Sequence, residues 1–329
     1  MSDRDDEAAD PASGNPPENG AALGRIDEAA ADALMAALGS AVRDLLARRL
    51  PPGLHLVATP IGNLGDITPR ALVTLLQADR VYCEDTRVSR PMLARFAVNR
   101  PLSSYHEHNA EAARRDILAR IAAGGTVALI SDAGMPAISD PGFKLARDVV
   151  AAGGDVFAVP GPTALTAALT VSGLPTDSFF FAGFLPPKSA ARRSRIAALA
   201  MIPASLIFYE SPHRVTAALI DLDAELGARP AALAREITKK YEEVRRGTLA
   251  ELAAWSSDTP PRGEIAIVVA PPSVPDTDAI DDAAILAALR GVLPDMRPAA
   301  AAKSVSKQLG VPRSRVYDLV LFLKNEPKD

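Results

Sequence analysis

One short segment places two carboxylates and a guanidinium directly after an apolar run. In Glu84-Asp85-Thr86-Arg87, either carboxylate can accept a proton from an attacking hydroxyl group and so act as a general base. Neighbouring residues of an extended chain point to opposite sides. We therefore expect one of Glu84 and Asp85 to face a ligand and the other to pair with Arg87. The alternative is an ion pair among all three without a catalytic role.

A second segment, Tyr209-Glu210-Ser211-Pro212-His213-Arg214, offers another carboxylate and an imidazole. Glu210 and His213 are further candidates for the general base, and Arg214 can hold a phosphate. A Ser/His/acid hydrolase is disfavoured, because Ser211 and His213 are only two residues apart and there is no Gly-x-Ser-x-Gly elbow. The structural alternative is that His213 simply starts a helix.

The sequence gives little support for metal chemistry. His106 and His108 have an i, i+2 spacing, but no third ligand lies nearby in the sequence, so we expect no metal site. Cys83 is the single cysteine, which excludes an internal disulfide and a cysteine-based zinc cluster. The cysteine count is consistent with a reducing cytosol.

Four loops rich in glycine, proline and small residues follow apolar runs and are candidates for a ligand cleft. They span residues 59–66, 84–87, 131–142 and 160–164. Such residues let the backbone approach a ligand closely. None of the loops has the GxxxxGK[ST] pattern of phosphate-binding loops or the GxGxxG pattern of dinucleotide sites. We therefore expect a nucleotide-sized ligand that contains an adenosine but no phosphate.

Short apolar strands and helical stretches alternate along the chain, which predicts an α/β fold with a parallel sheet. Ligands of such sheets bind beyond the carboxyl ends of the strands. The predicted strands of the first half are residues 54–58, 80–83, 126–130 and 156–159. Those of the second half are residues 178–183, 205–209, 231–235 and 264–270.

Five segments follow from this reading. We expect an acidic disordered tail over residues 1–24, a helical extension over 25–53, two α/β domains over 54–160 and 161–271, and a helical tail over 276–329. The tail contains three helical stretches, the last two separated by Gly310-Val311-Pro312, which is similar to a helix-turn-helix.

Composition and charge narrow the function classes. Of 329 residues, 48% are hydrophobic, which is enough for a packed core. No run of about 18 apolar residues that could span a membrane is visible, and we expect a cytoplasmic protein. The net charge of −4 is uneven. The first 20 residues carry −5, whereas the 33 residues from Arg297 onward carry +4, so an RNA partner is compatible with the acidic total.

Six motifs together resemble one known family. They are Val57–Asp66, Cys83–Arg87, Ser131–Gly142, Pro160-Gly161-Pro162, Gly183-Phe184-Leu185-Pro186 and Phe208–Arg214. They closely resemble the ribosomal RNA small subunit methyltransferase I family, a branch of the tetrapyrrole methylase superfamily, over about residues 54–271. The resemblance implies a parallel-sheet domain and a mixed-sheet domain with a cleft between them, S-adenosylmethionine as the cofactor, and a homodimer. The implied reaction is 2′-O-methylation of a cytidine in the decoding centre of 16S rRNA.

The resemblance also implies which residues hold the cofactor. This sequence has Ser131-Asp132-Ala133-Gly134 where the wider superfamily usually has Gly-Asp-Pro, so the resemblance constrains the contacts around Asp132 least. Carried onto matching positions, the implied cofactor-binding residues are Pro60, Gly62, Asp132, Ala133, Gly134, Met135, Ile138, Ser139, Thr163, Ala164, Phe184, Glu264 and Ile265.

RNA contact requires clustered positive charge, and the sequence offers two clusters and a basic tail. The first cluster runs from Lys188 to Arg195 and contains no acid, whereas the second, between Arg235 and Arg246, is interspersed with acids. Such runs are more often solvated faces than binding sites. The candidate RNA-binding residues are Lys188, Arg192, Arg193, Arg195, Arg214, Lys239, Lys240, Arg313 and Arg315.

Two other functions remain open at this point. The first keeps the fold and the cofactor but methylates carbon on a precorrin-type tetrapyrrole; the motifs at residues 83–87 and 208–214 and the basic tail argue against it. The second is a non-catalytic protein that binds nucleic acid through the C-terminal helices. It would leave the four cleft loops without a role.

Overall fold

The computed structural model describes residues 27–106, 108–138, 142–272 and 281–325. The chain divides into two compact units, residues 1–50 and 51–329. In the first unit, the helix α1 (Glu28–Leu46) starts at Asp27, whose side chain accepts a hydrogen bond from the backbone nitrogen of Ala29. No residue of α1 is buried. The predicted tail of residues 1–24 lies outside the described residues.

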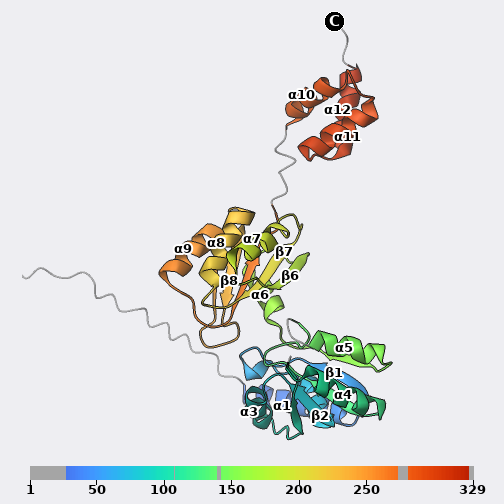
Figure 1. The fold of residues 1–329 in the computed structure, drawn as a ribbon, viewed down its shortest axis with the longest axis vertical. Coiled ribbons are helices and arrows are strands. Elements are labelled where there is room, and N and C mark those ends of the chain that lie inside the picture. The colour runs from blue at the N-terminus through green and yellow to red at the C-terminus, as the bar shows by residue number, and fades with distance from the viewer. Residues whose placement is uncertain (1–26, 107, 139–141, 273–280, 326–329) are drawn as a thin grey trace, which may run out of the picture. The chain divides into compact units, whose positions relative to one another are not determined.

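The first sheet of the second unit, of which β1 and β2 are labelled in Figure 1, is entirely parallel. Its strand order is β3-β2-β4-β1-β5. Its strands are β1 (Gly53–Val57), β2 (Arg80–Cys83), β3 (Leu102–Ser104), β4 (Thr126–Leu129) and β5 (Val156–Val159). The connecting helices are α2 (Pro69–Gln77), α3 (Thr86–Arg95), α4 (Ala110–Ala122) and α5 (Gly142–Ala151). A short 3-10 helix, η1 (Leu64–Asp66), precedes α2.

Helices cover both faces of this sheet. The helix that follows β1 and the helix that follows β4 lie on opposite faces. Alternating strand residues supply the two apolar layers. Val57 and Val81 pack with Leu75 of α2 on one face. Leu54 packs with Leu145 of α5 on the other. Because β1 and β4 are neighbours whose following helices lie on opposite faces, their carboxyl ends frame the crevice where α/β sheets bind ligands.

The second sheet is mixed, with the order β6-β7-β10-β8-β9. Only β6 and β7 run parallel, and the remaining pairs are antiparallel. Its strands are β6 (Phe179–Phe184), β7 (Ser205–Glu210), β8 (Pro230–Arg235), β9 (Glu243–Thr248) and β10 (Ile265–Val269). Its helices are α6 (Ala164–Ser172), α7 (Ser189–Ala197), α8 (Val215–Leu226) and α9 (Leu249–Asp258). The predicted α/β class, with a parallel sheet followed by a mixed one, is confirmed.

The C-terminal helices form a small bundle with its own core. It comprises α10 (Asp282–Val292), α11 (Pro298–Leu309) and α12 (Arg313–Asn325). Ile285, Ala301 and Val316, one from each helix, are fully buried in this core. Gly310 ends α11 with a φ of 71°, a left-handed conformation that glycine adopts readily. The bundle matches the three predicted helical stretches.

Four of the described elements were not predicted: η1, α3, β3 and β9. Helix α3 contains Pro91, and a proline inside a helix ordinarily argues against one. Strand β9 has the polar sequence Glu-Val-Arg-Arg-Gly-Thr and is identified only by its pairing with β8. The limits of the two α/β domains, drawn at residue 160, stay a prediction. Among the described helices, none is long and apolar enough to cross a membrane.

Candidate functional site

The loops after β1 and β4 are joined at the carboxyl edge of the parallel sheet. Thr59 and Gly134 exchange backbone hydrogen bonds of 3.0 and 3.1 Å. The Thr59 hydroxyl also donates to the carbonyl oxygen of Ser131 at 3.1 Å, and the Ser131 hydroxyl donates to that of Gly134 at 3.0 Å. These buried contacts fix the relative position of two of the four predicted cleft loops.

The loop after β2 is held to the same edge by a carboxylate. The backbone nitrogen of Asp85 donates to Oδ1 of Asp132 at 3.2 Å. Burial raises the pKa of the Asp132 carboxyl above its usual value, while the hydrogen bond from Asp85 acts in the opposite direction. Asp132 therefore lies in a partly desolvated position between the loops.

Gly134 is required by space as well as by conformation. Its φ is +83°, and a Cβ built there would lie 3.1 Å from Cγ2 of Ile61 and 3.3 Å from the carbonyl oxygen of Pro162. A side chain at this position would therefore meet both neighbouring loops at tight contact distances, and the loops would have to shift to admit it.

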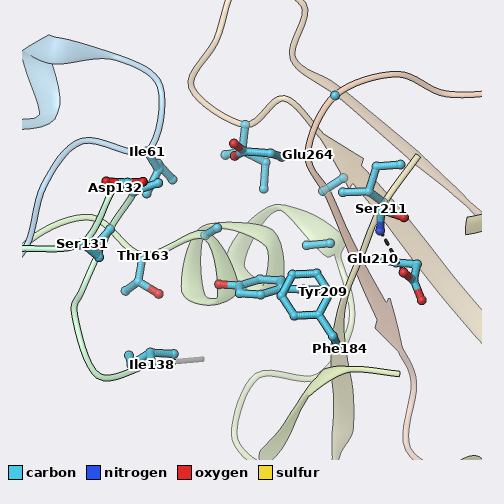
Figure 2. A pocket seen from close by; sticks show the side chains of 18 of the residues that line it. Ile61, Ser131, Asp132, Ile138, Thr163, Phe184, Tyr209, Glu210, Ser211 and Glu264 are labelled. Carbon is cyan, nitrogen blue, oxygen red and sulfur yellow. Dashed lines mark hydrogen bonds between the residues drawn. The ribbon is translucent and has the colours of Figure 1, made fainter. Parts of the chain in front are cut away.

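These loops face residues of the second sheet across a cavity of about 430 Å³, within the usual size range for a cofactor site. Figure 2 shows Asp132 and Ile61 from the first half of the unit, and Phe184, Tyr209, Glu210 and Glu264 from the second half. The lining residues are Ile61, Glu84, Ser131, Asp132, Ala133, Gly134, Met135, Ile138, Thr163, Ala164, Phe184, Tyr209, Glu210, Ser211, Pro212, Ala234, Ile237, Gly263, Glu264, Ile265 and Ala266.

The charge of this cavity is one-sided. Its described lining includes four carboxylates, Glu84, Asp132, Glu210 and Glu264, and no Lys, Arg or His. Cations outside the lining compensate two of these carboxylates, since Arg214 pairs with Glu210 and Lys239 pairs with Glu264. The lining itself offers a phosphate no basic side chain, whereas a cationic ligand would be attracted to the carboxylates. The lining therefore disfavours a nucleoside phosphate and favours a positively charged ligand with apolar parts.

Aromatic side chains form one wall. The Tyr209 ring meets Phe181 edge-on with a centroid distance of 4.9 Å, and it meets Phe184 at 5.7 Å. Burial raises the pKa of the Tyr209 hydroxyl above its usual value, so the hydroxyl stays protonated at neutral pH and can donate a hydrogen bond. Tyr209 and Phe184 lie side by side in Figure 2.

The two adjacent carboxylates have different surroundings. Glu84 lines the cavity and is exposed. Asp85 begins helix α3, where its Oδ1 accepts a hydrogen bond of 2.8 Å from the backbone nitrogen of Arg87. The Arg87 guanidinium donates hydrogen bonds to both carboxylate oxygens of Asp85 and lowers the pKa of that carboxyl to about 2. A carboxylate held in this way is a weak base, and neither Asp85 nor Arg87 lines the cavity.

Glu210 also lines the cavity, but it is committed to structural hydrogen bonds. Its side chain is fully buried, receives a 2.9 Å hydrogen bond from the backbone nitrogen of Ser211 and pairs with Arg214 at 3.1 Å. Arg214 in turn donates to the carbonyl oxygen of Leu185, so it ties β7 to the loop after β6. His213 is exposed and is not part of the lining.

Ten of the residues assigned to the cofactor through the resemblance line the cavity. Pro60 and Gly62 do not, although they flank Ile61, which does. Ser139 lies outside the described residues. The ten are Asp132, Ala133, Gly134, Met135, Ile138, Thr163, Ala164, Phe184, Glu264 and Ile265. Their binding role stays a prediction.

Arg192 was predicted to bind RNA because it belongs to a basic cluster. The structure contradicts that prediction. Its side chain is only 5% exposed, and its Nε lies 2.6 Å from Oδ2 of Asp221. The guanidinium also donates to the carbonyl oxygens of Pro187 and Ala217. These contacts use it to join α7 to α8, and it is not available to a phosphate. Its neighbour Arg193 is exposed and pairs with Glu225 at 2.6 Å.

The remaining basic candidates differ in their partners. Lys188 and Arg195 are exposed. Lys239 pairs with Glu236 at 2.9 Å and with Glu264 at 3.3 Å, beside the cavity. Lys240 is exposed and lies over the ring of Tyr241.

On the bundle, Arg313 is exposed, whereas Arg315 pairs with Asp282 at 2.8 Å. Like the other basic candidates, these residues have no contact in the structure that tests an RNA role.

Several residues that line the cavity were not predicted from the sequence. Tyr209 stands in one of the recognised motifs, directly before Glu210, and alternation along β7 could have identified it as facing away from Glu210 and Phe208. Ile61 is likewise flanked by two predicted positions. Ala234 and Ile237 carry no comparable signal, because ordinary core residues look the same in the sequence.

Comparison with known proteins agrees with this geometry. Residues 53–253 match the family model of the tetrapyrrole (corrin/porphyrin) methylases. A protein of Mesorhizobium japonicum, named ribosomal RNA small subunit methyltransferase I, is 46% identical over 86% of this chain and 96% of its own length. A protein of the same name from Xylella fastidiosa is 46% identical over 81% of this chain and 98% of its own.

The fold has solved counterparts. A cobalt precorrin-4 methyltransferase of cobalamin biosynthesis superposes with a TM-score of 0.52 over 66% of this chain and 94% of its own, at 19% identity. At that identity the likeness concerns the fold alone, whereas the sequence relatives match this chain over nearly their whole length. The chain therefore belongs to the ribosomal RNA small subunit methyltransferase I family, within the tetrapyrrole methylases.

Proposed function

We propose that this protein transfers the methyl group of S-adenosylmethionine to the ribose 2′-hydroxyl of a cytidine in the decoding centre of 16S rRNA. One observation carries the proposal: the cavity at the carboxyl edge of the parallel sheet is lined by four carboxylates and no basic side chain. This charge suits a sulfonium cofactor and opposes a phosphate-bearing one. The family to which the chain belongs supplies the substrate class.

The residues present fit that cofactor. Ile61, Met135, Ile138 and Ile237 give apolar walls of the kind that cover an adenine ring. The close backbone approach at Gly134 leaves room for a ligand between the loops. Asp132 and Glu264 can accept hydrogen bonds from ribose hydroxyls or from an ammonium group. When bound, S-adenosylmethionine supplies a methyl group on a positively charged sulfur, which an oxygen nucleophile takes by in-line displacement.

We assign the general base to Glu84. As the 2′-oxygen forms its bond to carbon, the hydroxyl proton must leave, and a carboxylate within reach accepts it. Glu84 lines the cavity and is exposed, whereas Asp85 and His213 do not line it and the side chain of Glu210 is fully buried. The fixed loops around Thr59 and Gly134 would hold the reacting groups in line, which contributes much of the rate of such a transfer.

The proposed partner is the small ribosomal subunit, and the proposed location is the cytoplasm, where that substrate is found. A homodimer is the proposed assembly. Phe143 and Val150 on α5 are each 63% exposed and offer apolar surface that a second copy could cover.

The test is transfer of tritium from labelled S-adenosylmethionine by the purified protein. Small ribosomal subunits from cells that lack the homologous enzyme are one substrate, and a precorrin is the other. We expect label in 16S rRNA, with the methylated ribose resistant to alkaline cleavage. Label on the macrocycle would instead establish the tetrapyrrole methylase alternative. Absence of cofactor binding by calorimetry would leave only a non-catalytic role.

A further inference from the structure

A second cavity, of about 210 Å³, lies beside the β8–β9 hairpin. Its lining brings together Arg235, Arg245, Arg262 and Trp255 with one acid, Glu243. None of these residues belongs to the first cavity or to the catalytic assignment above. The sequence pointed to Arg235 and Arg245 only as members of a charged run, and it gave no signal for Arg262 or Trp255.

The hairpin register explains why three of these side chains meet. Arg235 of β8 stands directly opposite Glu243 of β9, and cross-strand partners share one face of a sheet. Arg245 is two residues beyond Glu243 and so lies on the same face. The alternate residue, Val244, packs against the opposite core. The strand register therefore places Arg235 and Arg245 on the same face of the sheet, where both line the second cavity.

Two of the arginines are held in place. Nε of Arg235 lies 2.7 Å from Oε2 of Glu243, and the Arg245 guanidinium lies 4.4 Å from the centre of the Trp255 indole ring. Arg235 lowers the pKa of the Glu243 carboxyl, which stays ionised. Arg262 is exposed, and no described residue forms an ion pair with it. Three arginines against one glutamate leave two positive charges in excess.

Residues that line the two cavities are neighbours in the chain and in the sheet. Arg262 is followed directly by Gly263 and Glu264, both of which line the first cavity. Arg235 is the register partner of Ile265, another lining residue of the first cavity. The segment 262–264 and the Arg235–Ile265 pair thus link the basic cavity to the cavity lined by carboxylates.

We propose that the Arg235, Arg245 and Arg262 cavity binds a backbone phosphate of the RNA strand next to the nucleotide that is methylated. The inference rests on the proposed function. Guanidinium groups match phosphate oxygens in geometry and charge, and phosphate contacts fix the register of a bound strand. The acidic first cavity repels phosphates, so a strand that presents a ribose there needs its nearest phosphate neutralised alongside. The second cavity supplies that neutralisation.

Arg262 is the position to test, because its side chain is exposed and its removal breaks no described contact. The variants are Arg262→Ala, Arg262→Glu and Arg262→Lys. The matched control is Arg115→Ala, which removes an exposed arginine from α4 whose one ion pair among the described residues is with Glu111. For each protein, methyl transfer to small ribosomal subunits gives KM and kcat over a range of salt concentrations. Calorimetry gives the affinity for S-adenosylmethionine.

We expect Arg262→Ala to raise KM about tenfold, as expected for one lost hydrogen bond to a charged group, with cofactor affinity unchanged. The dependence of log KM on log salt should become shallower by about 0.7 for each lost phosphate contact. Arg262→Glu should have a larger effect, and Arg262→Lys should restore part of the loss. A KM and salt slope equal to those of Arg115→Ala would overturn the proposal.

Two further arms separate this inference from the proposed function. If the wild-type protein transfers no label, the proposed function fails, and filter binding of 16S rRNA by wild type and Arg262→Ala still decides the subsite, since equal binding overturns it. Inorganic phosphate is the second probe. Arg262-dependent binding of phosphate together with an unchanged KM for subunits would mean that the cavity serves a free anion, which also overturns the RNA assignment.

Discussion

Arg87 holds the carboxylate of Asp85 through two nitrogen atoms, with Nε 3.0 Å from Oδ1 and Nη2 2.6 Å from Oδ2. This pair removes Asp85 from the competition for a proton, although Asp85 stands beside Glu84 in the chain. The sequence predicted that one of the two carboxylates would pair with Arg87. The structure identifies the paired one as Asp85.

The first prediction separates these neighbours. Glu84→Gln should lower kcat by about 10²–10⁴-fold, the usual contribution of a general base, because an amide cannot accept the ribose proton. Asp85→Asn should leave most of the activity. Single-turnover transfer to small subunits measures the chemical step, and calorimetry should find cofactor affinity near wild type in both. Normal turnover by Glu84→Gln would remove Glu84 as the base.

The second prediction concerns Gly134. Gly134→Ala should weaken S-adenosylmethionine binding at least tenfold, because the new methyl group would meet Ile61 and the Pro162 carbonyl oxygen and push the loops apart. Gly153→Ala is the matched control, since Gly153 has a similar φ of +78° with nothing within 4 Å of a new Cβ. The control should cost about 1–2 kcal/mol of stability for the left-handed backbone and leave binding unchanged. Equal binding by both variants would contradict this view of the loops.

The third prediction is that the Asp132 carboxylate lowers the stability of the fold at neutral pH and raises the affinity for the cofactor. Its pKa is raised in the fold by burial, so the ionised form is disfavoured, and the stability that Asp132 contributes in acid is lost as the pH rises through that raised pKa. Asp132→Asn should therefore increase the free energy of unfolding at neutral pH, and the gain should vanish in acid below the usual aspartate pKa. Binding of the cationic cofactor should weaken. Urea unfolding at several pH values measures the change in stability, and calorimetry measures the change in cofactor affinity. If Asp132→Asn changed neither the free energy of unfolding nor the affinity, Asp132 would have neither role.

Arg192 should prove structural. Arg192→Ala leaves the buried Asp221 carboxylate, 9% exposed, without its ion-pair partner and with only the Ser189 hydroxyl as a described donor, which should cost about 3–5 kcal/mol of unfolding free energy. Arg193→Ala removes an exposed arginine one residue away and should leave the urea midpoint nearly unchanged. If Arg192→Ala instead kept full stability and bound subunits poorly, the original RNA assignment would be restored.

The C-terminal bundle is the subject of the last variant. Deletion of residues 276–329 should raise KM for the ribosomal substrate and make its salt dependence shallower, because phosphate contacts set that slope. The intact core of the bundle, with Ile285, Ala301 and Val316, implies that its loss leaves the cofactor cavity folded. An unchanged KM would mean that the bundle has no role in RNA binding.

Local pattern was enough to predict much of the fold. Alternating strands and helices gave the parallel sheet, and the four loops at its edge followed from that topology. Long-range pairing was not predictable in the same way. Strand β9 has few apolar residues, and what makes it a strand is its register with β8, including the Arg235–Glu243 pair.

The same distinction applies to the sites. Glu84 and Asp132 follow strands and could be placed at the cavity from sequence. Arg192 was misassigned because charge alone was considered. Its spacing of four residues from Ile196 puts both on the buried face of α7, a signal that helix periodicity offered. The cavity around Arg262 is lined by residues of a hairpin, a helix end and a loop, and no local pattern in the sequence predicts it.

The most direct test of the account is a map of ribose methylation in 16S rRNA from a strain that lacks this gene. The account predicts that one cytidine of the decoding centre loses its 2′-O-methyl group. The wild-type gene should restore it, and Glu84→Gln should not, although that variant still binds S-adenosylmethionine. A methylation map unchanged by the deletion would contradict the account.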